Sequence, residues 1–454
     1  MTSTAVRDVQ NSTEAPLVLT TDTPRTLGFL DQFTLWGNFG ISLFGPVTGA
    51  LVAAYTGSLV KGLLAVVIGC GIGALVVGGA AVFGSQTGAP AMVSLRGLFG
   101  RRGSVAPTVL NIAQNIGWAT MEIIVISQAA VAVTSERWRW VFVVLAGVIA
   151  TAMAVRPLGS VKLLRKFMVW LVLIASVYLF VAVLSKPVHS LPQEEVFGFW
   201  PAVDLAAAGV VSFAPLAADY TRHSRTNKAA FAGSALGYGI AAIVYYALGV
   251  LAVATLQTNS TDVITALVTL PAGAIALFVL LVDEVDEAYA NVYSTTMAAH
   301  NLIGHIDRRW ISVAIGVLAT GLALLVDLGN YTQFLYLIGS VFIPLFAVAI
   351  ADFFVVRKMR WDVSDTARFR WQPTLAWVFG FVAYQLVNPG TVKGWSPFWL
   401  DLQGRIFNGH AVPGWLGATY TSIVVSMLAA IVFGRLGRQY RPAEEGTVGS
   451  RSGT

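Results

Sequence analysis

About twelve apolar stretches, most of them long enough to cross a lipid bilayer as a helix, run along this chain of 454 residues. A membrane-spanning helix needs about 20 predominantly apolar residues, and this requirement leaves few folds open to the chain. We therefore expect an all-α polytopic membrane protein with about twelve transmembrane helices. The stretches cover residues 30–55, 59–83, 108–133, 140–155, 168–184, 199–218, 229–254, 271–302, 311–326, 331–355, 375–386 and 415–433.

Composition supports the same class of protein. Hydrophobic residues make up 56% of the chain and charged residues 11%, against roughly 25% charged residues in a typical soluble domain. The mean hydropathy is +0.71. The single cysteine, Cys70, excludes a disulfide within the chain and a metal site built from thiolates.

The basic residues predict the orientation. Most of the 29 Lys and Arg residues fall in alternate connections, on the side that also receives both ends of the chain. Because translocation of Lys and Arg is disfavoured, we expect both termini in the cytoplasm of a multi-pass protein of the cell membrane. Residues 1–27 and 438–454 would form cytoplasmic tails, the first without a signal peptide. The net charge of +6 then reflects topology and not binding of nucleic acid.

The stretch 271–302 carries four carboxylates at membrane depth: Asp283, Glu284, Asp286 and Glu287. An ionisable group there costs about 2.5–3.5 kcal/mol on translocon scales, so it persists where it faces protein, water or a ligand. At helical spacing Asp283 and Glu287 share a stripe with two further polar residues, and Asp286 points elsewhere. We expect this stripe to line an ion or substrate path; it consists of Asp283, Glu287, Asn291 and Ser294.

Helix breakers interrupt the first and sixth stretches. The first contains Gly37, Gly40, Gly45 and Pro46, and the sixth contains Gly209 and Pro215. Breaks five helices apart are typical of transporters built from inverted repeats, in which discontinuous helices expose backbone groups to a site at mid-membrane. We expect two inverted five-helix repeats, at 28–186 and 187–358, followed by two C-terminal helices within 359–437.

Several segments resemble the nucleobase:cation symporter-1 family, in its purine/cytosine permease branch. They are LDQFTLWGN at 30–38, GAPAMVSLRGLFGRRGS at 88–104, NIGWATME at 115–122, PLAADYTR at 215–222 and DEVDEAYANVYSTT at 283–296. The resemblance runs in order from about residue 28 to 352. It implies a fold of the leucine-transporter type and secondary active uptake of a small heteroaromatic substrate by cation symport. It implies no enzymatic activity and no cofactor.

The resemblance also implies a substrate site. Trp118 matches a tryptophan that stacks on the ring, and Glu122, one helical turn later, matches a residue that binds the ring edge. A flat ligand gains from an offset indole face, and a carboxylate can accept N–H bonds from an aminopyrimidine edge. Phe213 is the nearest aromatic for a second stacking face, since Val210 stands where some relatives have tryptophan. The remaining expected contacts are Asn38, Ser42, Thr296 and His300.

The sequence leaves two candidates for the coupling ion, sodium and the proton. In sodium-coupled relatives backbone carbonyls and hydroxyls hold the ion, and oxygen ligands suit a hard cation. Those positions match Asn38, Ile41, Asn291, Ser294 and Thr295, although Ser and Thr hydroxyls also bond their own helix backbone. Proton coupling would use Glu122, Asp283 or Glu287 instead. Asp219 and Arg222, at the end of the sixth stretch, are candidate gate residues or a simple helix-end pair.

Alternatives from other classes fit less well. An intramembrane enzyme lacks a metal-binding histidine spacing and a nucleophile beside a base, and a channel usually shows repeated pore loops or rings of short subunits. Within transporters we expect cytosine or another nucleobase as substrate. Hydroxymethylpyrimidine or another vitamin precursor, allantoin and hydantoins remain open, as does the oligomeric state. The expected partners are the substrate, a monovalent cation and the bilayer, with no nucleic acid.

Overall fold

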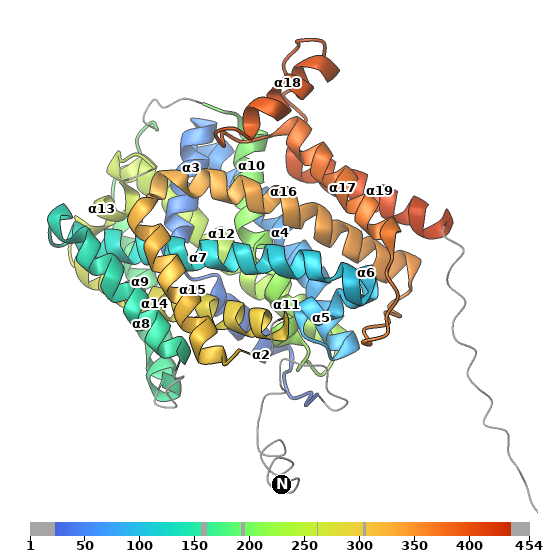
Figure 1. Cartoon of the computed structure of the whole chain (residues 1–454). Helices are drawn as coiled ribbons and strands as arrows, with labels where there is room; N and C mark the ends of the chain where they lie inside the picture. The colour runs from blue at the N-terminus through green and yellow to red at the C-terminus, as the bar shows by residue number, and fades with distance from the viewer. Residues whose placement is uncertain (1–22, 156–160, 192–195, 261, 303–305, 437–454) are drawn as a thin grey trace, which may run out of the picture.

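A computed structural model describes residues 23–155, 161–191, 196–260, 262–302 and 306–436. The described residues form helices, and the only β pairing among them is an isolated bridge between Leu27 and Ser224. Every apolar stretch predicted from the sequence falls on a helix or on a helix interrupted by a short break (Figure 1).

The helices follow one another in a single bundle. In chain order they are α2 (Phe29–Phe39), α3 (Phe44–Thr56), α4 (Leu59–Thr87), α5 (Ala91–Ser94), α6 (Arg96–Gly103), α7 (Val105–Ala132), α8 (Arg139–Val155), α9 (Val161–Leu184), α10 (Phe199–Val211), α11 (Ala217–Thr221), α12 (Asn227–Leu256), α13 (Val263–Val268), α14 (Gly273–Leu302), α15 (Arg308–Leu325), α16 (Tyr331–Ile350), α17 (Trp371–Val387), α18 (Ser396–Ile406) and α19 (Ala418–Leu436). Helix α18 projects from the end of the bundle opposite α2 (Figure 1).

Seven of the described helical segments are long and apolar enough to cross a membrane, and the pair α2 and α3 would make an eighth span. These two helices meet at an angle of 65° across a break of four residues. A second break follows α10, where a short 3-10 turn, Ala214–Leu216, leads into α11. Pro215 lies in this turn and removes a backbone donor, which favours an interruption of the helix. The predicted interruptions of the first and sixth stretches are therefore confirmed.

Glycines allow α3 to approach α12 closely. A Cβ on Gly49 would lie 1.8 Å from the carbonyl oxygen of Tyr246, and one on Gly249 would lie 2.0 Å from that of Pro46. Small residues of this kind let membrane helices pack backbone to backbone. This contact holds α12 against the first broken helix. The division into the repeats 28–186 and 187–358, with helices 359–437 added, stays a prediction.

Candidate functional site

A cavity lies where the two helix breaks face each other inside the bundle. The break between α2 and α3 and the break between α10 and α11 both contribute to its wall, together with α7, α12, α14 and α16. Breaks expose backbone N–H and C=O groups that a continuous helix would use internally. The fold therefore collects irregular backbone and long polar side chains at one point in the interior.

One face of α7 forms the most polar side of this cavity. Asn115, Trp118 and Glu122 line it, at spacings of three and four residues that place them on one helical face. Asn115 has no exposed surface, Glu122 is 2% exposed and Trp118 is 8% exposed. The sequence interpretation named Trp118 and Glu122, and it missed Asn115 although the same spacing extends one turn back.

These three residues have polar atoms without partners. Both amide atoms of Asn115, the indole Nε1 of Trp118 and Oε2 of Glu122 make no hydrogen bond. Buried polar atoms in proteins are nearly always hydrogen-bonded, so a group of them around one cavity marks a place for a bound molecule. The atoms include donors and acceptors, which a ligand with a mixed polar edge can satisfy together.

Aromatic rings make up much of the remaining wall. Trp118 packs edge-on against Phe44 and Phe334, with ring centroids 5.5 and 5.3 Å away. Phe213, from the break after α10, also lines the cavity and lies 4.8 Å from the ring of Tyr238 on α12. Rings from α7 and from the second break thus reach the same space, and both can offer contact area to a flat ligand.

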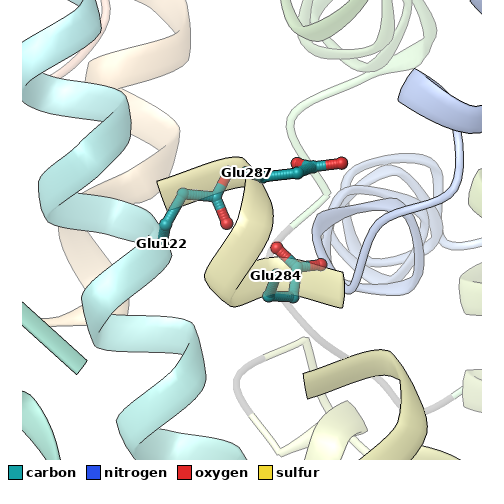
Figure 2. A group of neighbouring side chains, drawn as sticks. All are labelled: Glu122, Glu284 and Glu287. Carbon is teal, nitrogen blue, oxygen red and sulfur yellow. The ribbon is translucent and has the colours of Figure 1, made fainter. Parts of the chain in front are cut away.

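Three glutamates meet beside the cavity. Carboxylate oxygens of Glu122, Glu284 and Glu287 all lie within 4.8 Å of one another. Figure 2 shows Glu122 extending from α7 toward the turn of α14 that carries the other two. Like charges at this distance repel in a low-dielectric interior, so such a cluster takes up protons or a positively charged group.

Comparison with known proteins identifies the family. The family described as "Permease for cytosine/purines, uracil, thiamine, allantoin" matches residues 20–405. The chain belongs to this permease family. A curated relative from Bacillus subtilis (strain 168), named "Putative purine-cytosine permease YxlA", is 22% identical over 428 residues, which cover 88% of the chain and 92% of the relative. The protein is accordingly a membrane transporter and not an enzyme.

Solved structures share the fold of the permease. The nucleobase-cation-symport-1 transporter Mhp1 in a closed conformation with bromovinylhydantoin bound superposes with a TM-score of 0.68 at 17% identity, covering 94% of the permease and 95% of Mhp1. Its inward-facing conformation gives 0.70 at 16% identity, with coverage of 93% and 95%. MhsT in complex with L-phenylalanine gives 0.51 at 16% identity, covering 90% of the permease and all of MhsT. The predicted leucine-transporter type of fold is confirmed.

Long polar side chains of the permease form hydrogen bonds with polar groups at both helix breaks. Glu284 Oε1 accepts hydrogen bonds from Ser42 Oγ, at 2.8 Å, and from the backbone N–H of Leu43, both in the first break. Gln114 Nε2 on α7 donates to the carbonyl oxygen of Ser212 at the second break, at 2.8 Å. Backbone polar groups inside a membrane must find such partners within the protein. The sequence interpretation gave neither Glu284 nor Gln114 a specific role.

The polar face of α14 is rotated from the predicted one. Glu287 and Asn291 line the cavity, and Glu284 lies one turn earlier beside them. Asp283 and Ser294, predicted for the same stripe, are half-buried and lie outside the cavity wall. Spacings of three and four residues connect Glu284, Glu287 and Asn291, and this pattern was equally readable in the sequence. The side chain of Asp286 lies outside the described residues.

The remaining expected ligands lie in different surroundings. Ser42 lines the cavity together with Phe39 and Gly40, whereas Asn38 and Ile41, which flank those two residues, are not part of its wall. Thr295 is buried, and its hydroxyl donates to the carbonyl oxygen of Asn291 at 2.7 Å. Thr296 Oγ1 donates to its own helix and lies 3.1 Å from Ser312 Oγ on α15, outside the cavity wall. The side chain of His300 lies outside the described residues.

The candidate gate residues lie at the end of α11. Asp219 accepts a hydrogen bond from the backbone N–H of Ala91, at 2.8 Å, and so ties α11 to the start of α5. Arg222 is buried in the same region. Close by, Leu27 pairs with the turn after α11 through bonds to His223 and Arg225. The segment that precedes α2 is thereby fastened across the end of the second broken helix.

Proposed function

We propose that the permease imports a flat heteroaromatic molecule of the nucleobase type by symport with a monovalent cation. The observation that carries this proposal is the set of buried, unpartnered polar atoms on Asn115, Trp118 and Glu122 around a cavity with aromatic walls. Relatives in the family act on cytosine and purines, uracil, thiamine and allantoin according to its description. We also propose that the permease lies in the cell membrane with both of its termini in the cytoplasm.

In the proposed complex the ring lies against Trp118 and Phe213. The edge of the ring exchanges hydrogen bonds with Asn115 and Glu122, which satisfies polar atoms that otherwise stay buried without partners. A ring substituted so that it cannot make these bonds leaves them unmet, which costs affinity. Cytosine or a purine leads among cargoes, and hydroxymethylpyrimidine, other vitamin precursors, allantoin and hydantoins are the alternatives.

Sodium is the first candidate for the coupling ion. Its proposed ligands are the backbone carbonyls of Asn38, Ile41 and Asn291 and the hydroxyls of Ser294 and Thr295. The hydroxyl of Thr295 uses its proton within α14, so its oxygen keeps a lone pair for a cation. Protons, held by Glu122, Asp283 or Glu287, are the alternative. The glutamate cluster supports this alternative, because neighbouring carboxylates readily share a proton.

The test is uptake of labelled nucleobases and vitamin precursors by proteoliposomes that contain the purified permease. We expect one heteroaromatic cargo to accumulate against its gradient when a sodium or proton gradient is imposed. The same panel is screened by thermal shift with and without sodium. Transport that no ion gradient drives, or binding of no ring in the panel, contradicts the proposed function.

A further inference from the structure

The cavity wall carries carboxyl groups and aromatic rings and no basic side chain among the residues that line it. Seven of the 18 lining residues are aromatic, and two, Glu122 and Glu287, are acidic. Aromatic faces are electron-rich and attract cations. Both features therefore favour the same kind of ligand.

A third carboxylate adds to the acidic character of this site. Glu284 is buried next to Glu122 and Glu287, and its Oε2 makes no hydrogen bond in the described structure. Its other oxygen already accepts two bonds from the first helix break. A positively charged group in the cavity reduces the mutual repulsion of these carboxylates, whereas a negatively charged ligand increases it.

A second observation points to a ligand at the same place. Asn115 and Trp118 line this cavity and carry buried polar atoms without partners. Neither residue belongs to the acidic cluster, so the cluster alone does not account for their unmet hydrogen bonds. The amide of Asn115 offers a donor and an acceptor, which suit a ring that bears amino groups or ring nitrogens.

We propose that the natural cargo is a cationic heteroaromatic, with its positive charge on or conjugated to the ring, held by Glu122 between aromatic faces. Protonated aminopyrimidines, amidinium-bearing rings and rings with a quaternary nitrogen belong to this class. This inference rests on the proposed function and narrows its cargo to one charge class, to which cytosine and the purines belong only in their protonated forms. Anionic rings are excluded from the site, and neutral rings bind less tightly than cationic rings of the same size.

Matched ring pairs test the proposal on the purified, full-length permease. The first pair is 4-aminopyridine, which is protonated at pH 7, and 4-pyridone, which is neutral; the second is benzamidine and benzamide. Apparent dissociation constants come from thermal-shift titrations at fixed sodium and pH. We expect the cationic member of each pair to bind at least tenfold more tightly than the neutral one.

Two isosteric variants assign the effect to the cavity. Glu122→Gln should reduce the preference for the cation to less than threefold, because glutamine keeps the shape and one acceptor oxygen of the side chain and lacks the charge. Glu287→Gln is the second variant, in case Glu122→Gln does not fold. Glu136→Gln removes an exposed carboxylate of the turn Glu136–Trp138, outside the cavity, and should keep the full preference.

The outcomes separate this inference from the proposed function. Neutral rings that bind as tightly as cationic ones overturn the charge class, and the ring site of the proposed function then stands with protonated glutamates. A cation preference that survives in both cavity variants also overturns the inference. If no ring of either charge binds, the proposed function itself fails, and the inference fails with it.

Discussion

At the scale of single residues, Glu284 connects the acidic cluster to the first helix break. One of its oxygens accepts bonds from Ser42 and Leu43, and its other oxygen lies in the group with Glu122 and Glu287. A proton or cation that reaches the cluster therefore acts on a side chain that also holds unwound backbone. Glu284 therefore joins the acidic cluster to the backbone of the break between α2 and α3.

Replacement of Glu284 by alanine should lower the melting temperature of the permease more than replacement by glutamine. Both variants remove the charge, but glutamine keeps a carbonyl oxygen that can accept the bonds from Ser42 and Leu43. A buried N–H left without an acceptor costs about 1–3 kcal/mol. Thermal-shift measurements without ligand compare the two variants. Equal melting temperatures would mean that these hydrogen bonds contribute nothing to stability.

Removal of the indole of Trp118 should weaken cargo binding by about 1–2 kcal/mol, which corresponds to the loss of an aromatic stacking partner. The variant Trp118→Ala should still fold, because the ring faces the cavity and does not serve only to pack two helices together. Trp140→Ala is the matched control, since Trp140 is 61% exposed at the surface of α8. An unchanged dissociation constant in Trp118→Ala would remove this residue from the site.

At the scale of elements, the connection between α16 and α17 is fastened to the α5–α6 segment. Buried Asp352 accepts two bonds from Arg370, at 2.6 and 3.1 Å, and one from Trp361 Nε1 at 2.8 Å. Arg370 also donates to the carbonyl oxygen of Gly97 at 2.9 Å. Gly100 has φ +77°, and a Cβ there would lie 2.1 Å from the carbonyl oxygen of Arg368. These contacts tie the connection between α16 and α17 to the α5–α6 segment.

The ion pair between Arg370 and Asp352 should contribute far more to the stability of the fold than an exposed pair in the same chain. Arg370→Ala leaves Asp352 buried without its guanidinium, a change that costs about 3–5 kcal/mol. Arg405→Ala breaks a pair with Asp401 whose side chains are 75% and 63% exposed, and such pairs contribute about 0–1 kcal/mol. Melting temperatures of both variants provide the comparison. Similar losses in the two would contradict a structural role for the buried pair.

At the scale of the whole molecule, the proposed symport requires that cargo and cation stabilise each other's binding. Sodium should raise the affinity for cargo, and cargo should raise the affinity for sodium by the same factor, because linkage is reciprocal. Thr295→Ala should remove this dependence. Thr296→Ala should retain it, because its hydroxyl lies against Ser312 on α15. Calorimetric titrations of each ligand in the presence of the other measure both factors.

Affinity that ignores sodium and changes with pH would contradict sodium coupling. The glutamate cluster would then be the next site to test, with Glu122→Gln and Glu287→Gln as the first variants. Because a gradient of either ion can drive symport, this result would change the proposed coupling ion and leave the proposed symport in place. Uptake that is indifferent to both gradients would contradict the proposed cation symport.

Local sequence predicted the elements of this permease well. Apolar length predicted the helices, because a bilayer rewards about 20 apolar residues wherever they occur in a chain. Glycine and proline predicted interruptions of the first and sixth stretches, which the structure places at 40–43 and 212–216, because their effect on the backbone acts within a few residues. The segment around Trp118 and Glu122 carried the family resemblance, and both residues lie at the cavity.

Tertiary structure alone decided which side chains meet. Among the acids of α14, Glu284 and Glu287 lie with Glu122, whereas the sequence interpretation favoured Asp283 and Glu287. Helical periodicity relates residues on one helix, but the rotation of that helix about its axis depends on packing against α7, α8, α9 and α15. The same reason separates Asn291, at the cavity, from Thr296, which faces α15. The sequence thus determined the membrane class, the helices, their breaks and the family, and packing determined the composition of the site.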